Sequence, residues 1–235
     1  MKTSVSLLLL TAALAASAAP VFEDTMAQRT LACSACHGKE GRAGPDGYYP
    51  RIAGKPAGYL YNQLLNFRDG RRHYGLMARL LVPLSDAYLL EIAQHFAALD
   101  IPYPAPAAAS LPAAALQRGQ VLALQGDPAA QVPACVQCHG EALTGVLPNT
   151  PGLLGLPRDY LSAQLGAWKT GQRRAHAPDC MAQIARELAP EDLAAVSGWL
   201  ASQPLPADPH PVARLAQAPT IACGSAALPA GRQRP

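Results

Sequence analysis

The chain has 235 residues, of which 50% are hydrophobic and 15% are charged, and its formal net charge is +3 at pH 7. So small an excess of basic residues argues against nucleic acid or an anionic membrane surface as the partner. Aromatic residues make up only 6% of the chain. That is little for the cores of two small domains, so a bound cofactor is expected to add stability.

Residues 1–19 have the pattern of a secretory signal peptide. Lys2 precedes an apolar run from Val5 to about Leu14, and small residues follow as far as Ala19. The apolar run is too short to span a bilayer comfortably, and no later stretch is long enough either. We therefore expect a mature protein without a membrane span, exported to an oxidising compartment, most simply the periplasm.

The first half of the chain carries the stretch CSACHG at residues 33–38. Two amphipathic helices are predicted after it. One covers residues 59–68 and ends before Gly70, and the other begins after a cap at Ser85 and runs to about residue 99. No stretch alternates apolar and polar residues convincingly, so no sheet is predicted.

A proline-rich segment, IPYPAPAAASLPAAA, separates the two halves at residues 101–115. Its prolines exclude a continuous helix and favour an extended, semi-rigid linker. The second half carries CVQCHG at residues 135–140. Helices are predicted over residues 116–125, 160–169 and 190–201.

The two halves are related by duplication. The segment PRIAGKPAGYLYNQLLNFRDGRR from Pro50 aligns with PGLLGLPRDYLSAQLGAWKTGQR from Pro151, and Phe67 falls opposite Trp168. We therefore expect two small domains of the same fold. The predicted boundaries are residues 20–100 for the first domain, 101–115 for the linker, 116–203 for the second domain and 204–235 for a proline- and alanine-rich tail.

The repeated Cys-x-x-Cys-His pattern places two thiols one helical turn apart and an imidazole directly after them. This arrangement allows both sulfurs to add to the vinyl groups of a haem while the histidine coordinates the iron, as in c-type haem. A zinc site normally has four ligands, and a redox dithiol is expected in a βαβ context, so both alternatives are less well supported. Two covalently bound haem c groups are predicted, with attachment at Cys33, Cys36, Cys135 and Cys138 and iron ligation by His37 and His139.

The sixth iron ligands are predicted to be methionines. Apart from Met1 the chain has three, and Met26 lies before the first motif, where core packing is expected. Met77 and Met181 occupy equivalent places after His37 and His139, so they are the predicted axial ligands. Ligation by histidine and methionine raises the reduction potential and suits an electron carrier.

Other residues near these methionines leave alternatives open. His73 and His176 are candidate ligands in place of methionine, or neighbours of the haem edges or propionates. His95 and His210 are interpreted as surface or linker residues. The forked guanidinium groups near the two methionines suit haem carboxylates, and they belong to Arg71, Arg72, Arg173 and Arg174.

Two cysteines lie outside the attachment motifs. In an oxidising compartment, a disulfide between Cys180 and Cys223 would pin the tail over the second domain. The alternative is that Cys180 ligates iron as a thiolate, as occurs in some dihaem enzymes acting on sulfur compounds.

These motifs together resemble the periplasmic dihaem cytochromes c of the cytochrome c4 type. The resemblance covers residues 27–203 and depends on two tandem CxxCHG modules, each followed by a Gly-Pro-Tyr-Leu-Gln-Leu pattern and then a lone methionine. It implies an all-α fold of two tandem class I cytochrome c domains. The second copy departs from the pattern at PGLLG and in the segment RRAHAPDCM, which is three residues longer than its partner.

The resemblance also implies a function. The expected protein is a monomeric electron shuttle, not an enzyme, that passes electrons from a quinol-oxidising complex toward a terminal oxidase or another acceptor. One alternative is a dihaem oxidoreductase of the peroxidase or thiosulfate-oxidising type. Another is the electron-transfer subunit of a dehydrogenase, with the tail after residue 204 as a docking segment.

Overall fold

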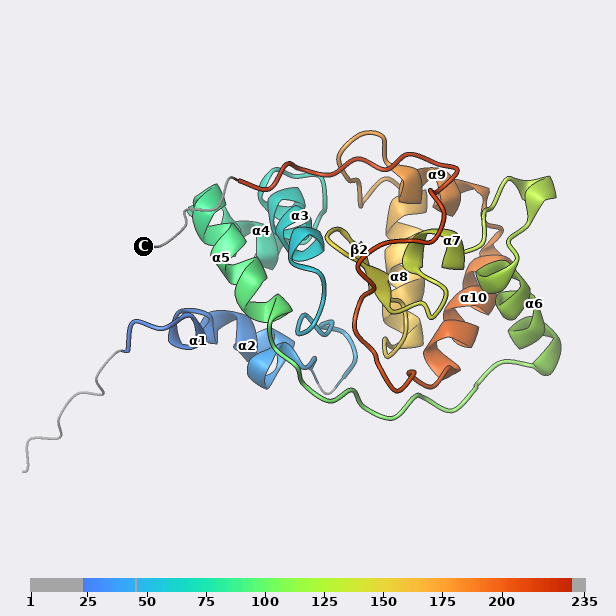
Figure 1. The fold of residues 1–235 in the computed structure, drawn as a ribbon, viewed down its shortest axis with the longest axis horizontal. Helices are drawn as coiled ribbons and strands as arrows, with labels where there is room; N and C mark the ends of the chain where they lie inside the picture. The colour runs from blue at the N-terminus through green and yellow to red at the C-terminus, as the bar shows by residue number, and fades with distance from the viewer. Residues whose placement is uncertain (1–22, 45, 230–235) are drawn as a thin grey trace, which may run out of the picture.

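The computed structural model describes residues 23–44 and 46–229, so the predicted signal peptide lies outside the described residues. Two groups of helices stand side by side (Figure 1). We call residues 23–100 the first module and residues 113–203 the second module. An extended linker of residues 101–112 joins them, and residues 204–229, the C-terminal strap, run back from the second module to the first.

The first module holds five α-helices and a short 3₁₀ helix among the described residues. They are α1 (Met26–Arg29), α2 (Leu31–His37), η1 (Lys39–Gly41), α3 (Ala57–Arg68), α4 (Gly75–Leu81) and α5 (Asp86–Ala97).

The second module has the same number of α-helices, but its 3₁₀ helix precedes the Cys-x-x-Cys-His helix and two short strands are added. Its elements are α6 (Ala113–Leu124), η2 (Pro128–Ala130), α7 (Val136–His139), β1 (Gly145–Val146), β2 (Thr150–Pro151), α8 (Arg158–Lys169), α9 (Cys180–Glu187) and α10 (Pro190–Ser202).

The predicted helices all form, with differences of one to three residues at their starts and ends. The Ser85 side chain accepts a hydrogen bond from the Tyr88 backbone N–H and so caps α5 as predicted. Helix α6 begins at Ala113, three residues inside the predicted linker, because Pro112 fits the position before a helix and the alanines after it favour helix.

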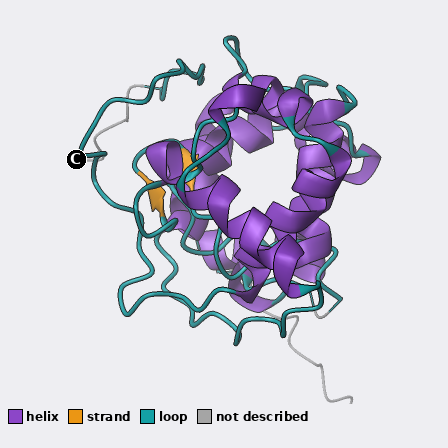
Figure 2. Ribbon diagram, turned by 90° about the vertical axis from the view of Figure 1, so that its right-hand side faces the viewer, coloured by secondary structure: helices purple, strands orange, loops and turns teal. Residues whose placement is uncertain are grey.

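The absence of a sheet was predicted, and the structure corrects this in one place. Strands β1 and β2 form an antiparallel ladder in which Gly145 pairs with Pro151 and Val146 with Thr150. Strands of two residues are too short to show any alternation in the sequence, which is why the pattern missed them. Figure 2 shows this ladder among the loops on one side, with the helices gathered on the other.

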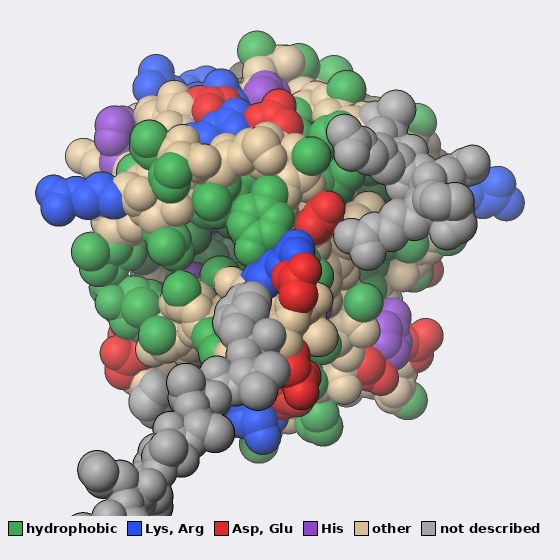
Figure 3. Space-filling model, turned by 90° about the vertical axis from the view of Figure 1, so that its left-hand side faces the viewer, with side chains coloured by type: hydrophobic (Ala, Val, Ile, Leu, Met, Phe, Trp, Pro, Cys, Tyr) green, Lys and Arg blue, Asp and Glu red, His purple; other side chains and the backbone are tan. Residues whose placement is uncertain are grey.

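The helices pack in the same way within each of the two modules. Helix α3 packs on α4 and α5, and α8 packs in the same way on α9 and α10. Each module has its own hydrophobic cluster, centred on buried side chains such as Leu89 and Phe96 in the first and Leu122 and Leu200 in the second. The face of the first module away from the second mixes apolar, basic and acidic side chains (Figure 3).

The closest approach between helices in the second module depends on a glycine. A Cβ atom on Gly119 of α6 would lie 2.3 Å from the carbonyl oxygen of Ala195 on α10. Glycine therefore allows the two helix backbones to pack in direct contact.

Candidate functional site

Each Cys-x-x-Cys-His motif ends a short helix. Cys33, Cys36 and His37 lie on α2, whereas Cys138 and His139 end α7 and Cys135 is its N-cap. Both histidine side chains are buried, with 8% of the surface of His37 and 7% of that of His139 exposed. The helical turn places the two sulfurs and the imidazole of each motif on one local scaffold.

A backbone carbonyl orients each of the two histidines. The Nδ1 atom of His37 lies 2.8 Å from the Pro50 carbonyl oxygen, and that of His139 lies 2.7 Å from the Pro151 carbonyl oxygen. A carbonyl only accepts, so Nδ1 carries the hydrogen and the lone pair stays on Nε2. Burial lowers the pKa of both imidazoles below its usual value, which favours the neutral form that binds a metal.

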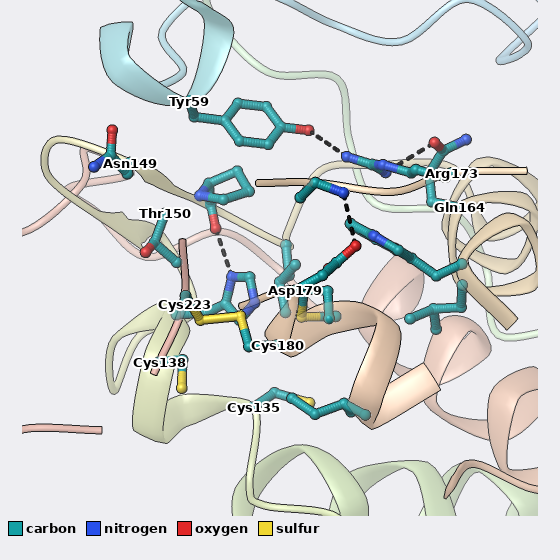
Figure 4. Close-up of a pocket in the computed structure, with 18 of the residues that line it drawn as sticks. Tyr59, Cys135, Cys138, Asn149, Thr150, Gln164, Arg173, Asp179, Cys180 and Cys223 are labelled. Carbon is teal, nitrogen blue, oxygen red and sulfur yellow. Dashed lines mark hydrogen bonds between the residues drawn. A yellow bond between two sulfur atoms is a disulfide. The ribbon is translucent and has the colours of Figure 1, made fainter. Parts of the chain in front are cut away.

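A cavity of about 420 Å³ opens beside the second motif. The thiol-bearing Cys135 and Cys138, the His139 ring and Met181 all line it (Figure 4). Its apolar wall consists of leucine, isoleucine and tryptophan side chains, among them Leu153, Leu156, Leu161, Leu165, Trp168, Ile184 and Leu188. An apolar chamber lined by two thiols, an imidazole and a thioether fits a haem group.

The first module repeats this set of groups. Cys33 and Met77 both pack against its hydrophobic cluster, and His37 lies buried at the end of α2. Met77 lies on α4 and Met181 on α9, the helices that occupy equivalent places in the two modules.

Basic side chains from both modules meet where the modules touch. Arg72 and Arg173 pair as an antiparallel β-bridge, with the backbone N–H of His73 donating to the Gln172 carbonyl at 2.9 Å. Their guanidinium groups share the same two acceptors, because each donates to the side-chain oxygens of both Gln63 and Gln164, at 2.6 to 3.0 Å.

Other contacts of Arg72 and Arg173 also join residues that are equivalent in the two modules. Arg72 donates to the Tyr160 hydroxyl and Arg173 to the Tyr59 hydroxyl, both at 3.4 Å. Arg72 stacks over Phe67 and Arg173 over Trp168. We call these residues, together with Lys55, the interface cluster: Lys55, Tyr59, Gln63, Phe67, Arg72, Tyr160, Gln164, Trp168 and Arg173.

The interface cluster concentrates positive charge. Lys55 and Arg173 are buried, with 6% and 3% of their surface exposed. In the described part of the chain, the hydrogen bonds of Arg72 and Arg173 go to amide and phenol oxygens, and neither pairs with a carboxylate. Buried cations need anionic partners, and the propionate groups of a haem supply such anions.

Burial lowers the pKa of Lys55 and of Arg173, because the protein interior disfavours their charged forms. Burial alone would raise the pKa of Tyr59, but the nearby Arg173 and Arg72 bring it down to about 8. Lys55, Tyr59 and Arg173 also line the cavity of the second module (Figure 4). The cluster therefore faces that cavity as well as the junction between modules.

The four arginines singled out in the sequence separate into two groups. Arg72 and Arg173 belong to the interface cluster. Arg71 lies outside it and donates hydrogen bonds to the side-chain oxygens of Asn66 and Asp69. Arg174 donates to the Gly70 carbonyl oxygen. Sequence reasoning missed the roles of the paired tyrosines and glutamines, although their retention in both copies was the available signal.

The histidines near the methionines occupy different environments. His176 lines the cavity, and its Nε2 lies 3.3 Å from an Arg71 nitrogen. His73 is exposed, whereas His95 is half-buried on α5. His210 is exposed on the C-terminal strap beside Asp208.

The predicted disulfide is confirmed. Cys180 and Cys223 are bonded, with their Cα atoms 5.0 Å apart. The bond occupies the Cys180 sulfur, so in this state Cys180 is not available as a thiolate ligand. Among the described residues, no helix is long and apolar enough to cross a membrane.

Comparison with known proteins supplies the family. No protein-family model matches the chain. The thiosulfate dehydrogenase electron acceptor of Thiomonas intermedia is 38% identical over 189 residues, which cover 80% of this chain and 86% of that protein. Cytochrome c4 of Pseudomonas aeruginosa is 31% identical, over 73% of this chain and 84% of that protein.

Solved structures agree with these relatives. Reduced cytochrome c4 from Pseudomonas stutzeri superposes with a TM-score of 0.64 and 27% identity, over 75% of this chain and 96% of that one. A thiosulfate dehydrogenase from Marichromatium purpuratum superposes with a TM-score of 0.65 and 33% identity, over 74% of this chain. The match spans only 36% of that dehydrogenase chain.

The relatives agree with the two motifs, the apolar cavity and the repeated helices. The protein is an electron carrier with two covalently bound haem c groups and a tandem cytochrome c fold. The chain belongs to the family of dihaem c-type cytochromes that includes cytochrome c4 and the thiosulfate dehydrogenase electron acceptor.

Proposed function

We propose that the protein accepts electrons from a thiosulfate-oxidising dehydrogenase and passes them to a further redox protein. The observation that supports this is the identity of 38% and 37% to two proteins named thiosulfate dehydrogenase electron acceptor, against 31% and 33% to two cytochromes c4. This proposal takes up the sequence-based alternative of an electron-transfer subunit.

A second candidate donor remains from the sequence. The likeness to cytochrome c4, in sequence and in structure, supports a carrier between a quinol-oxidising complex and a terminal oxidase. The two candidate functions use the same chemistry at the haems. They differ in the protein that donates electrons to this one.

We propose that one haem is attached at Cys33 and Cys36 and the other at Cys135 and Cys138. The haem iron supplies the chemistry, a reversible change of one electron between the ferric and ferrous forms. In this proposal His37 and His139 bind iron through Nε2, because Nδ1 is held by a backbone carbonyl in each.

Met77 and Met181 are the residues that would supply the remaining iron ligands. A thioether favours the ferrous state and raises the reduction potential, which suits a carrier that accepts electrons. The leucine-rich wall of the cavity would keep water from the second haem, and the cations of the interface cluster would hold its propionate groups. Interface cations from both modules would bring the two haems together at the junction.

We also propose that the modules correspond to two domains, residues 20–100 and 116–203, as the separate hydrophobic clusters support. A periplasmic monomer remains the proposed form. It depends on the signal peptide pattern in residues 1–19 and on the family.

The donor is tested by rapid mixing. The oxidised dihaem protein is mixed with thiosulfate and a catalytic amount of a purified thiosulfate dehydrogenase, and haem reduction is followed by visible absorbance. We expect full reduction of both haems, dependent on the dehydrogenase. Reduction no faster than with thiosulfate alone, together with rapid reduction by a quinol-oxidising complex, would favour the second candidate donor.

A further inference from the structure

The two modules differ at the residue that precedes the lone methionine. In the first module this residue is Leu76, which is 61% exposed. In the second it is Cys180, the first residue of α9, bonded to Cys223 of the C-terminal strap. The helix that carries Met181 is therefore tied covalently to a segment 43 residues further along the chain.

The C-terminal strap is held at two further places. The Val212 backbone N–H donates to the Gly145 carbonyl at 3.0 Å, and the Val212 carbonyl accepts from the Leu147 N–H at 2.9 Å. The Ala226 N–H donates to the side-chain oxygen of Asn62, on α3 of the first module, at 2.7 Å. The strap thus runs from the β1 strand past α9 to the first module, as Figure 1 shows along the upper edge.

Near the disulfide the strap packs closely. The Gly224 N–H donates to the Pro178 carbonyl at 2.8 Å, and a Cβ atom on Gly224 would lie 2.3 Å from the Ala177 carbonyl oxygen. The Ser225 hydroxyl accepts from the Asn149 side chain at 3.1 Å. Glycine at position 224 therefore allows the strap to pack directly on the backbone of the segment that leads into α9.

The strap also forms part of the cavity wall. Cys223, Gly224 and Ser225 line the cavity, together with Met181 and Cys180 (Figure 4). The strap therefore lies against the start of the helix that carries Met181, where the first module has the exposed Leu76.

We propose that the Cys180–Cys223 disulfide and the strap position Met181 on the second haem iron and close that side of the site to other ligands. The inference depends on the proposed assignment of Met181 as axial ligand. A thioether is a weak ligand on a flexible side chain, and α9 has only eight residues to hold it. A covalent constraint on the adjacent residue reduces the number of conformations in which the sulfur is away from the iron.

The disulfide is tested in the dihaem protein with the double variant Cys180→Ala/Cys223→Ala. We expect the near-infrared Met–iron band to fall toward half intensity and carbon monoxide to bind one ferrous haem. One midpoint potential should fall by at least the equivalent of a tenfold change in equilibrium constant, about 59 mV. The first haem should keep its potential and so report that the protein is folded.

The matched pair Gly224→Ala and Gly166→Ala keeps the disulfide intact. Gly224→Ala pushes the strap from the Ala177 carbonyl and should shift the same potential in the same direction. Gly166→Ala adds the same methyl group on α8, where a Cβ atom meets nothing within 4 Å, and should leave both potentials unchanged. If the double variant is isolated without its second haem, the comparison of these two variants tests the proposal. A shift in Gly166→Ala as large as in Gly224→Ala would contradict the proposal.

The outcomes separate this proposal from the assignment of the ligand. A wild-type protein without a Met–iron band of two-haem intensity contradicts the assignment of the methionines. A wild-type protein with the full band, together with a double variant in which the band and both potentials are unchanged, overturns only the positioning role of the disulfide.

Discussion

The two modules share one plan for holding a haem but differ in what surrounds it. Each has a buried histidine whose Nδ1 is hydrogen-bonded to a backbone carbonyl, and each has a methionine on the equivalent helix. Among the residues that the structure describes, only the second module has a disulfide-bonded strap against its methionine helix. The shared parts are those that covalent attachment and ligation require, and the differences lie in the surroundings that adjust a potential.

A second difference concerns buried charge. Lys55 of the first module lines the cavity of the second, and the aligned residue of the second module is the apolar Leu156. The second haem site therefore has a buried cation at a position whose aligned residue in the second module is apolar. We expect the two haems to have different reduction potentials, which would give electron transfer between them a direction.

Removal of the attachment cysteines should have the largest effect. The double variant Cys135→Ala/Cys138→Ala should lose the second haem and leave its leucine-rich cavity without its occupant, so the second module should unfold at lower temperature. The haem-to-protein ratio, measured by absorbance, should fall from two to one. Cys33→Ala/Cys36→Ala is the matched variant, and a ratio that stays at two in either would contradict the assignment of that motif.

Replacement of a methionine ligand should lower one potential and spare the other. Met77→Ala and Met181→Ala should each lower the potential of their own haem by about 100 mV or more, a small part of the about 0.8 V range that axial ligands span. Redox titration followed in the visible and near-infrared distinguishes the two. Met26→Leu is the control, since Met26 packs against the first hydrophobic cluster. A lost Met–iron band in that variant would contradict the ligand assignment.

The sequence was sufficient for the parts of the site that obey strict local spacing. The Cys-x-x-Cys-His motif is a single helical turn, so its two copies could be found without a structure. The helices at residues 59–68 and 160–169 follow from amphipathic periodicity between a proline and a glycine. The Cys180–Cys223 disulfide was an expectation from cysteine count and compartment, and the structure supplied the required proximity.

The interface cluster could not be predicted in the same way. Its contacts join residues about a hundred positions apart, such as Arg173 and Gln63, and depend on how two folded modules dock. Helical periodicity identifies the face of a helix that is buried but not its partner. The path of the strap likewise depends on Asn62, a residue of the other module that no local pattern connects to Ala226.

The buried lysine gives a prediction of intermediate size. In Lys55→Leu the first module receives the leucine that the second module has at the aligned position. The variant also removes a positive charge, and this charge disfavours the ferric, more positive form of the second haem. We expect the potential of the second haem to fall and the first to change less. Arg79→Leu, at an exposed position of the first module, is the charge-matched control. Equal shifts in the two variants would show that net charge, rather than Lys55, sets the difference.

The smallest predicted effect is on stability and concerns how each module closes. In the second module α6 packs directly on α10 through Gly119, whereas in the described part of the first module the four-residue α1 contacts α5. Gly119→Ala places a methyl group against the backbone of Ala195, so it should lower the free energy of unfolding of the second module by about 1–3 kcal/mol.

Gly166→Ala is the matched control within the same module, because a Cβ atom there meets no atom within 4 Å. Alanine favours a helix interior over glycine by about 0.5–1 kcal/mol, so this variant should be slightly stabilised. Denaturant unfolding of the dihaem protein measures both, and equal destabilisation by the two variants would show that the α6–α10 contact does not limit the stability of the second module.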